Sequence, residues 1–101
     1  MTKREKILQQ WEKAVDERIA TVEAVLKQYG FVLATRSGSH CTYDHPKLQE
    51  AYDKIKNTNV DLREAFGPHG QLTFPIKGGQ KVKGKYLRII LYAIEIVSQN
   101  Q

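Results

Sequence analysis

The sequence contains a single cysteine, three histidines and no long apolar run. One cysteine cannot form an internal disulfide, and one cysteine with so few histidines cannot supply the ligand spacings of a structural zinc site. No stretch approaches the ~18 consecutive apolar residues that a membrane span requires, and the N-terminal "MTKREKILQQ" is charged where a signal peptide would be apolar. The sequence therefore predicts a cytoplasmic protein with no membrane association, no metal site and no cofactor.

The chain is short but has enough apolar residues for one domain. It has 101 residues, of which 41% are hydrophobic and 9% aromatic, and a net charge of +5. The positive surplus lies mostly in "KGGQKVKGKYLR", residues 77–88, which contains Lys77, Lys81, Lys83, Lys85 and Arg88. Such a basic strip is typical of proteins that bind polyanions, and the alternative is a solvated lysine-rich loop.

The N-terminal third has the periodicity of a helix. Apolar residues recur at steps of three and four from Ile7 to Tyr29 and predict a helix over about residues 3–29. At ~1.5 Å per residue this helix would be ~40 Å long, more than the ~30 Å diameter of a domain of this size. Either the helix breaks near Asp16, or its first half projects and buries Trp11 against another chain, which would give a homo-oligomer through the N-terminal helix.

The remainder of the chain alternates between strand and helix patterns. The predicted elements are strands in "FVLATR" (31–36), "HCTYDH" (40–45) and "QLTFPIK" (71–77), one or two short helices within 47–70 and a final helix after Gly84. Because Pro75 cannot donate a ladder hydrogen bond, the third strand is expected at a sheet edge. This order predicts an α+β fold in which a three-stranded antiparallel sheet is covered by helices on one face.

Strand parity separates the histidines of the second strand. Alternate residues of a strand point to opposite faces, so Cys41 and Tyr43 are predicted to face the core while His40 faces outward. Antiparallel pairing with the third strand would bring Lys77 close to His40. His45 has the parity of Tyr43 and is predicted to lie away from His40.

An exposed imidazole beside lysines suits the cleavage of RNA. Neutral imidazole can take a proton from a ribose 2′-hydroxyl near pH 7, and ammonium groups stabilise charge on the phosphate oxygens. His40 is therefore the candidate catalytic residue, whereas His69 in "GPHG" is expected to be an ordinary loop residue. The candidate RNA-binding residues are Arg36, Gly38, Ser39, Lys77, Lys81, Lys83 and Lys85. The alternative is that His40 is an unremarkable surface histidine in a turn.

Two segments together resemble the HicA (YcfA-like) toxins of bacterial toxin–antitoxin systems. They are "LKQYGFVLATRSGSHCTYDHP" and "LTFPIKGGQKVKGKYLRIIL", and the resemblance covers about residues 19–45 and 71–97. The shared features are Gly30 and Phe31 before the first strand, the Gly-Ser-His triplet ending at His40 with the aromatic Tyr43 three residues later, a proline-containing third strand, and a final helix led by glycine.

The resemblance implies a single HicA-like domain over residues 1–101. Its fold would be the α-β-β-β-α arrangement of a double-stranded-RNA-binding domain. Its activity would be that of an mRNA interferase, a ribosome-independent and metal-independent endoribonuclease, with His40 as the essential histidine. Its partners would be mRNA and a HicB-type antitoxin that covers the active surface.

The sequence departs from this family in three places. Many members have a histidine after the proline of the third strand, where this chain has Lys77, so a second acid–base group is either absent or replaced by a cation. Residues 47–70 form a longer insertion than is usual, and residues 1–18 form an N-terminal helical extension without a counterpart. Two further hypotheses therefore stand beside the toxin: a catalytically silent RNA-binding module of the same fold, and an interaction protein that assembles through the Trp11 helix.

Overall fold

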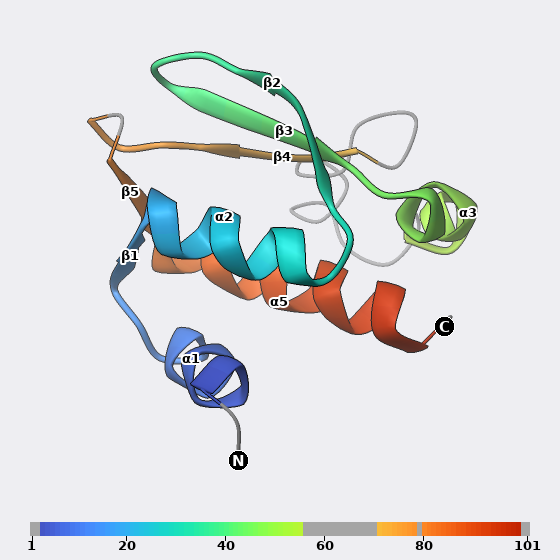
Figure 1. Ribbon diagram of the computed structural model, residues 1–101, viewed down its shortest axis with the longest axis horizontal. Helices are drawn as coiled ribbons and strands as arrows, with labels where there is room; N and C mark the ends of the chain where they lie inside the picture. The colour runs from blue at the N-terminus through green and yellow to red at the C-terminus, as the bar shows by residue number, and fades with distance from the viewer. Residues whose placement is uncertain (1–2, 56–70, 79, 100–101) are drawn as a thin grey trace.

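The computed structural model describes residues 3–55, 71–78 and 80–99 and has an α+β architecture (Figure 1). The elements in chain order are α1 (Lys3–Trp11), β1 (Asp16–Arg18), α2 (Ile19–Gln28), β2 (Val32–Arg36), β3 (His40–Asp44), α3 (Pro46–Ile55), β4 (Leu72–Pro75), β5 (Lys81–Lys83) and α5 (Gly84–Gln99). The part of the predicted insertion that follows α3, including His69, lies outside the described residues. Within those residues, no helix has both the length and the apolar character needed to span a membrane.

The predicted three-stranded antiparallel sheet is confirmed. Its order is β2-β3-β4, which places β4 and its Pro75 at an edge as expected. Helices α2 and α5 lie on the same face of this sheet (Figure 1). On that face Cys41 pairs with Phe74 and Tyr43 with Leu72, and all four side chains are buried. The rings of Tyr43 and Phe74 stack with their centroids 6.0 Å apart, so the core lies between this face and the two helices.

The long N-terminal helix breaks, as the first of the two alternatives predicts. Helix α1 ends at Trp11, the chain runs extended through β1, and α2 begins at Ile19. The Trp11 side chain is completely buried in the core of its own chain, and its indole N–H donates to Glu17 at 3.1 Å. The guanidinium of Arg88 donates to the carbonyl oxygens of Trp11 and Ala14, both at 3.1 Å. Trp11 is therefore an interior residue and not an exposed assembly surface.

A second, two-stranded sheet connects the segment that follows α1 with the segment that precedes α5. Strands β1 and β5 pair antiparallel, with Asp16 opposite Lys83 and Arg18 opposite Lys81. The backbone N–H of Gly84, the next residue, donates to the Val15 carbonyl at 2.7 Å. The sequence pattern did not indicate this sheet, and it is the reason that the predicted helix breaks near Asp16.

A glycine ends α2 and directs the chain into the sheet. Gly30 has a φ of 88°, which is unfavourable for residues with a Cβ. Its N–H bonds to the carbonyl of Lys27, and the N–H of Phe31 bonds to that of Leu26, both at 3.1 Å. These two bonds form a Schellman motif, which fixes the direction in which the chain leaves α2 and enters β2.

Candidate nucleic-acid interface

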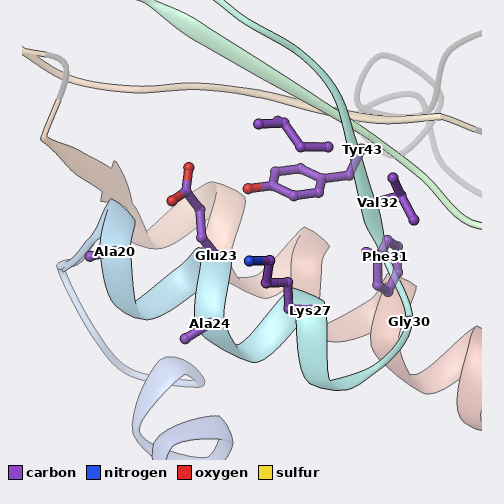
Figure 2. A pocket seen from close by; sticks show the side chains of 9 residues that line it. Ala20, Glu23, Ala24, Lys27, Gly30, Phe31, Val32 and Tyr43 are labelled. Atoms are coloured by element: carbon purple, nitrogen blue, oxygen red, sulfur yellow. The ribbon is translucent and has the colours of Figure 1, made fainter.

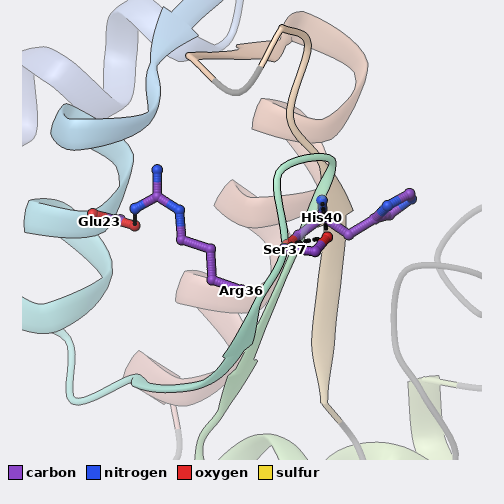
Figure 3. Close-up of polar contacts among 4 residues, drawn as sticks. All are labelled: Glu23, Arg36, Ser37 and His40. Carbon is purple, nitrogen blue, oxygen red and sulfur yellow. Dashed lines mark hydrogen bonds and ion pairs between the residues drawn. The ribbon is translucent and has the colours of Figure 1, made fainter.

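The turn between β2 and β3 holds His40 in a defined position (Figure 3). The Ser37 hydroxyl oxygen accepts hydrogen bonds from the backbone N–H groups of Ser39 and His40, at 3.3 and 3.0 Å. The backbone N–H of Ser37 donates to the His40 carbonyl at 2.9 Å. Gly38, at the tip, has open space where a side chain would be. Gly38 and Ser39 are therefore part of the turn that positions His40, and their contact with RNA stays a prediction.

The imidazole of His40 is exposed and points away from α2, as Figure 3 shows. It lies on the face of the three-stranded sheet turned away from α2 and α5, which we call the outer face. Its Nδ1 is 3.0 Å from the Ser39 hydroxyl oxygen. When Nδ1 donates its proton to that oxygen, Nε2 presents a lone pair outward and can act as a base toward a bound ligand.

Pairing with β4 places His40 beside a basic pocket. His40 lies directly opposite Pro75, and the N–H of Ile76 donates to the Ser39 carbonyl at 2.7 Å. Pro75 and Ile76 in turn line a pocket of about 380 Å³ between β4 and the start of α5. The other residues that line this pocket are Lys77, Lys83, Lys85 and Tyr86.

Three of the four predicted lysines thus come together, and one does not. Lys81 is absent from the lining of the pocket, and its ammonium group lies 3.9 Å from the Asp16 carboxylate. Within the described parts of the chain, Lys77 and Lys83 have no ion-pair partner. No acidic side chain lines the pocket, so its potential is positive.

Arg36, by contrast, is separated from His40 by the sheet. The register of β2 on β3 shifts between Leu33 and Thr35, and Arg36 pairs with the inward-facing Cys41. The guanidinium therefore faces α2, where it forms an ion pair with Glu23 at 2.7 Å (Figure 3). Its predicted place among residues that contact RNA at His40 is not supported by this geometry.

One residue of the pocket lining, Tyr86, had no clear signal in the sequence, and two threonines lie near the pocket without lining it. Thr42 and Thr73 share the outer face with His40, and their hydroxyl oxygens are 3.0 Å apart. Tyr86 lines the basic pocket, but in the sequence it stands within the apolar run of the final helix and reads as a core residue. Only its position directly after Gly84 and Lys85, at the exposed start of that helix, sets it apart.

His45 lies apart from His40, as strand parity predicts, and has a structural role. It is buried, and its ring lies against Phe31 with centroids 4.8 Å apart. Nδ1 accepts the backbone N–H of Lys47 at 3.1 Å, so Nε2 carries the proton and donates to the Tyr29 carbonyl at 2.9 Å. Both ring nitrogens are satisfied by backbone groups at the end of α2 and the start of α3.

A larger, mainly apolar hollow of about 760 Å³ lies between α2 and β2 (Figure 2). At one side the Tyr43 hydroxyl points toward the Glu23 carboxylate. Burial, followed by the negative charge of Glu23, raises the pKa of Tyr43 well above its ordinary value. The hollow contains no histidine or cysteine, and across the residues that the structure describes no group of three His, Cys, Asp or Glu side chains is arranged to hold a metal ion. The surface around His40 is therefore the better candidate for a functional site.

No family model, no curated protein and no solved structure matches this chain. The class of protein that the site defines is accordingly a small α+β protein with an exposed histidine beside a basic pocket. Its function has to be inferred from that geometry and from the motif that contains His40.

Proposed function

We propose that this chain is an RNA endonuclease, an mRNA interferase of the HicA type that acts as the toxin of a type II toxin–antitoxin system. The observation that carries the proposal is the pairing of His40 with Pro75, which sets an exposed imidazole next to a pocket lined by Lys77, Lys83 and Lys85. A base and several cations at adjacent positions are what cleavage of RNA without a metal requires.

The chemistry follows from these positions. Nε2 of His40 takes the proton of a ribose 2′-hydroxyl, and the 2′ oxygen attacks the adjacent phosphorus. The bond from phosphorus to the 5′ oxygen breaks, that oxygen takes a proton from water or from the imidazolium, and the products are a 2′,3′-cyclic phosphate and a 5′-hydroxyl. The ammonium groups of Lys77 and Lys83 stabilise the charge that builds on the phosphate oxygens. In this scheme Lys77 acts as a cation where related toxins carry a second histidine.

The order α2-β2-β3-β4-α5 supports a fold like that of a double-stranded-RNA-binding domain, with α1, β1, α3 and β5 as additions. An antitoxin of the HicB type would neutralise such a protein by covering the outer face around His40. A protein that acts on mRNA and is held by such a partner would work in the cytoplasm.

The decisive experiment compares His40→Ala with the wild-type chain on single-stranded RNA in the presence of a metal chelator. We expect cleavage to fall by about 10²- to 10⁴-fold, the usual contribution of a general acid or base. The fold should persist, because the His40 ring is exposed and its hydrogen bond is to the neighbouring Ser39. Thr42→Ala, on the same strand and face, is the matched control and should cleave at nearly the wild-type rate. Undiminished cleavage by His40→Ala would refute the mechanism.

A catalytically silent RNA-binding module is the second candidate, favoured by the lysine at position 77. It predicts RNA binding that weakens steeply with salt, because binding releases counterions from the phosphates, together with no cleavage at any protein concentration. Measuring binding and cleavage on the same RNA separates the two functions. Lys83→Gln should weaken binding in both cases, whereas His40→Ala should change cleavage only in the first.

A further inference from the structure

We propose that the basic pocket between β4 and α5 is a subsite for one nucleotide of single-stranded RNA, in which Tyr86 and Pro75 hold the base and Lys77 and Lys83 hold its phosphate. This assignment rests on the proposed RNA cleavage and identifies the part of the substrate that the pocket receives. It makes Tyr86 a specificity-determining residue.

The shape of the pocket suits a flat aromatic ligand. Ile76 lines it and is buried at 4% exposure, and the rings of Pro75 and Tyr86 line it and are half-buried. Aromatic rings are the usual platforms on which unpaired bases stack. The volume of about 380 Å³ lies near the lower end of the ~300–1,000 Å³ of small-molecule sites, which leaves room for a mononucleotide.

The charges of the pocket require that the ligand be an anion as well as aromatic. Lys77, Lys83 and Lys85 are the charged residues that line it, and the Lys85 ammonium lies 5.8 Å from the centre of the Tyr86 ring. A phosphate and a base can therefore be contacted by side chains that are already adjacent. An acidic peptide would satisfy the lysines but leave the two rings unused, so a nucleotide fits both features.

The position of the pocket links the nucleotide to the chemistry. Directly paired residues of an antiparallel ladder have side chains ~5 Å apart, so a base resting on Pro75 has its ribose and phosphate within reach of His40. The nucleotide in the pocket is then adjacent to the bond that is cut. Base preference at that position should follow from contacts with Tyr86.

The test measures binding of uridine 3′-monophosphate, adenosine 3′-monophosphate and inorganic phosphate by isothermal titration calorimetry. Wild-type protein should bind the nucleotides about tenfold or more tightly than phosphate, as expected for one stacked base. Tyr86→Leu should reduce nucleotide affinity to that of phosphate, and Tyr86→Phe, which keeps the ring, should retain it. Lys83→Gln should weaken all three ligands, whereas Lys81→Gln, on the same strand but outside the pocket, should leave all three unchanged.

Equal affinity of wild-type protein for nucleotides and phosphate would overturn the proposal, as would unchanged nucleotide binding by Tyr86→Leu. Thermal unfolding of each variant establishes that it is folded, and the exposed Lys83→Gln provides a test that does not alter the core. The two proposals fail separately. Nucleotide binding without any RNA cleavage removes the nuclease and keeps the pocket. Cleavage that depends on His40 but not on Tyr86 keeps the nuclease and removes the pocket.

Discussion

Replacing Gly84 with alanine would drive a methyl group into the backbone where α5 begins. A Cβ at this position would lie less than 3.0 Å from the carbonyl oxygen of Ala14, and two nitrogens of Arg88 are 3.0 Å from the same point. The neighbouring oxygen belongs to the backbone and is itself an acceptor for Arg88. It cannot move aside without loosening the hydrogen bond between Gly84 and Val15.

The size of the effect is a balance of three contributions. Forcing an extra methyl group into a filled site costs ~1–3 kcal/mol, and weakening the Gly84 to Val15 hydrogen bond adds ~1 kcal/mol. Alanine recovers ~0.5–1 kcal/mol because it restricts the unfolded chain more than glycine does. We therefore expect Gly84→Ala to lower the free energy of unfolding by about 1–3.5 kcal/mol, which corresponds to a fall in Tm of about 4–28 °C for a domain of this size.

Thermal unfolding followed by circular dichroism measures this change, and the chain offers a matched control. Gly38 has no atoms within 4 Å of its would-be Cβ and no positive φ, so Gly38→Ala should alter stability by less than ~0.5 kcal/mol. If the two variants melt at the same temperature, the close approach of α5 to the segment before β1 is not as described.

Three other residues give sharp expectations. His45→Ala removes the hydrogen-bond partner of two part-buried backbone groups and should destabilise the fold by about 1–3 kcal/mol in urea unfolding. RNA cleavage should be retained under conditions where the protein is folded, and loss of cleavage without loss of stability would contradict the structural role of His45. The pKa of Tyr43 is raised from its ordinary value of 10.0 by burial and by Glu23, so above pH 10 the unfolded chain releases a proton that the folded chain keeps. Stability should therefore fall as pH rises beyond 10, by up to ~1.4 kcal/mol per pH unit from this group, and Tyr43→Phe should flatten that fall in urea titrations at pH 9–12; an identical slope would disprove the assignment. Arg36→Gln should leave the cleavage rate unchanged in the RNA assay, because the guanidinium faces α2. Loss of this partly exposed ion pair should lower the free energy of unfolding by at most ~1 kcal/mol. A clear drop in the cleavage rate would instead show that Arg36 contacts the RNA.

Local patterns in the sequence were sufficient to predict the central sheet and the outward orientation of His40. Alternation of apolar residues located β2, β3 and β4, and parity alone separated the exposed His40 from the buried His45. These features depend on neighbours in the sequence, which is why they could be predicted.

Features that depend on contacts between distant segments of the chain, or on the exact register of two strands, could not be predicted. Val15 continues the helical stripe in the sequence but is 86% exposed in the fold, because β1 pairs with a charged segment at the far end of the chain. Arg88 belongs to the basic strip by its position in the sequence, yet its guanidinium donates hydrogen bonds to the carbonyl oxygens of Trp11 and Ala14. Arg36 changes face through a register shift within β2, and a register shift leaves no mark in the alternation of side chains.

The pairing of β1 with β5 also determines when during synthesis the protein can fold. Trp11 and β1 leave the ribosome well before their partners, β5 and α5, have been made. Contacts between such distant segments form slowly, because the intervening chain must first be closed into a loop. The core that supports His40 is therefore completed only after α5 has left the ribosome, although His40 itself leaves much earlier.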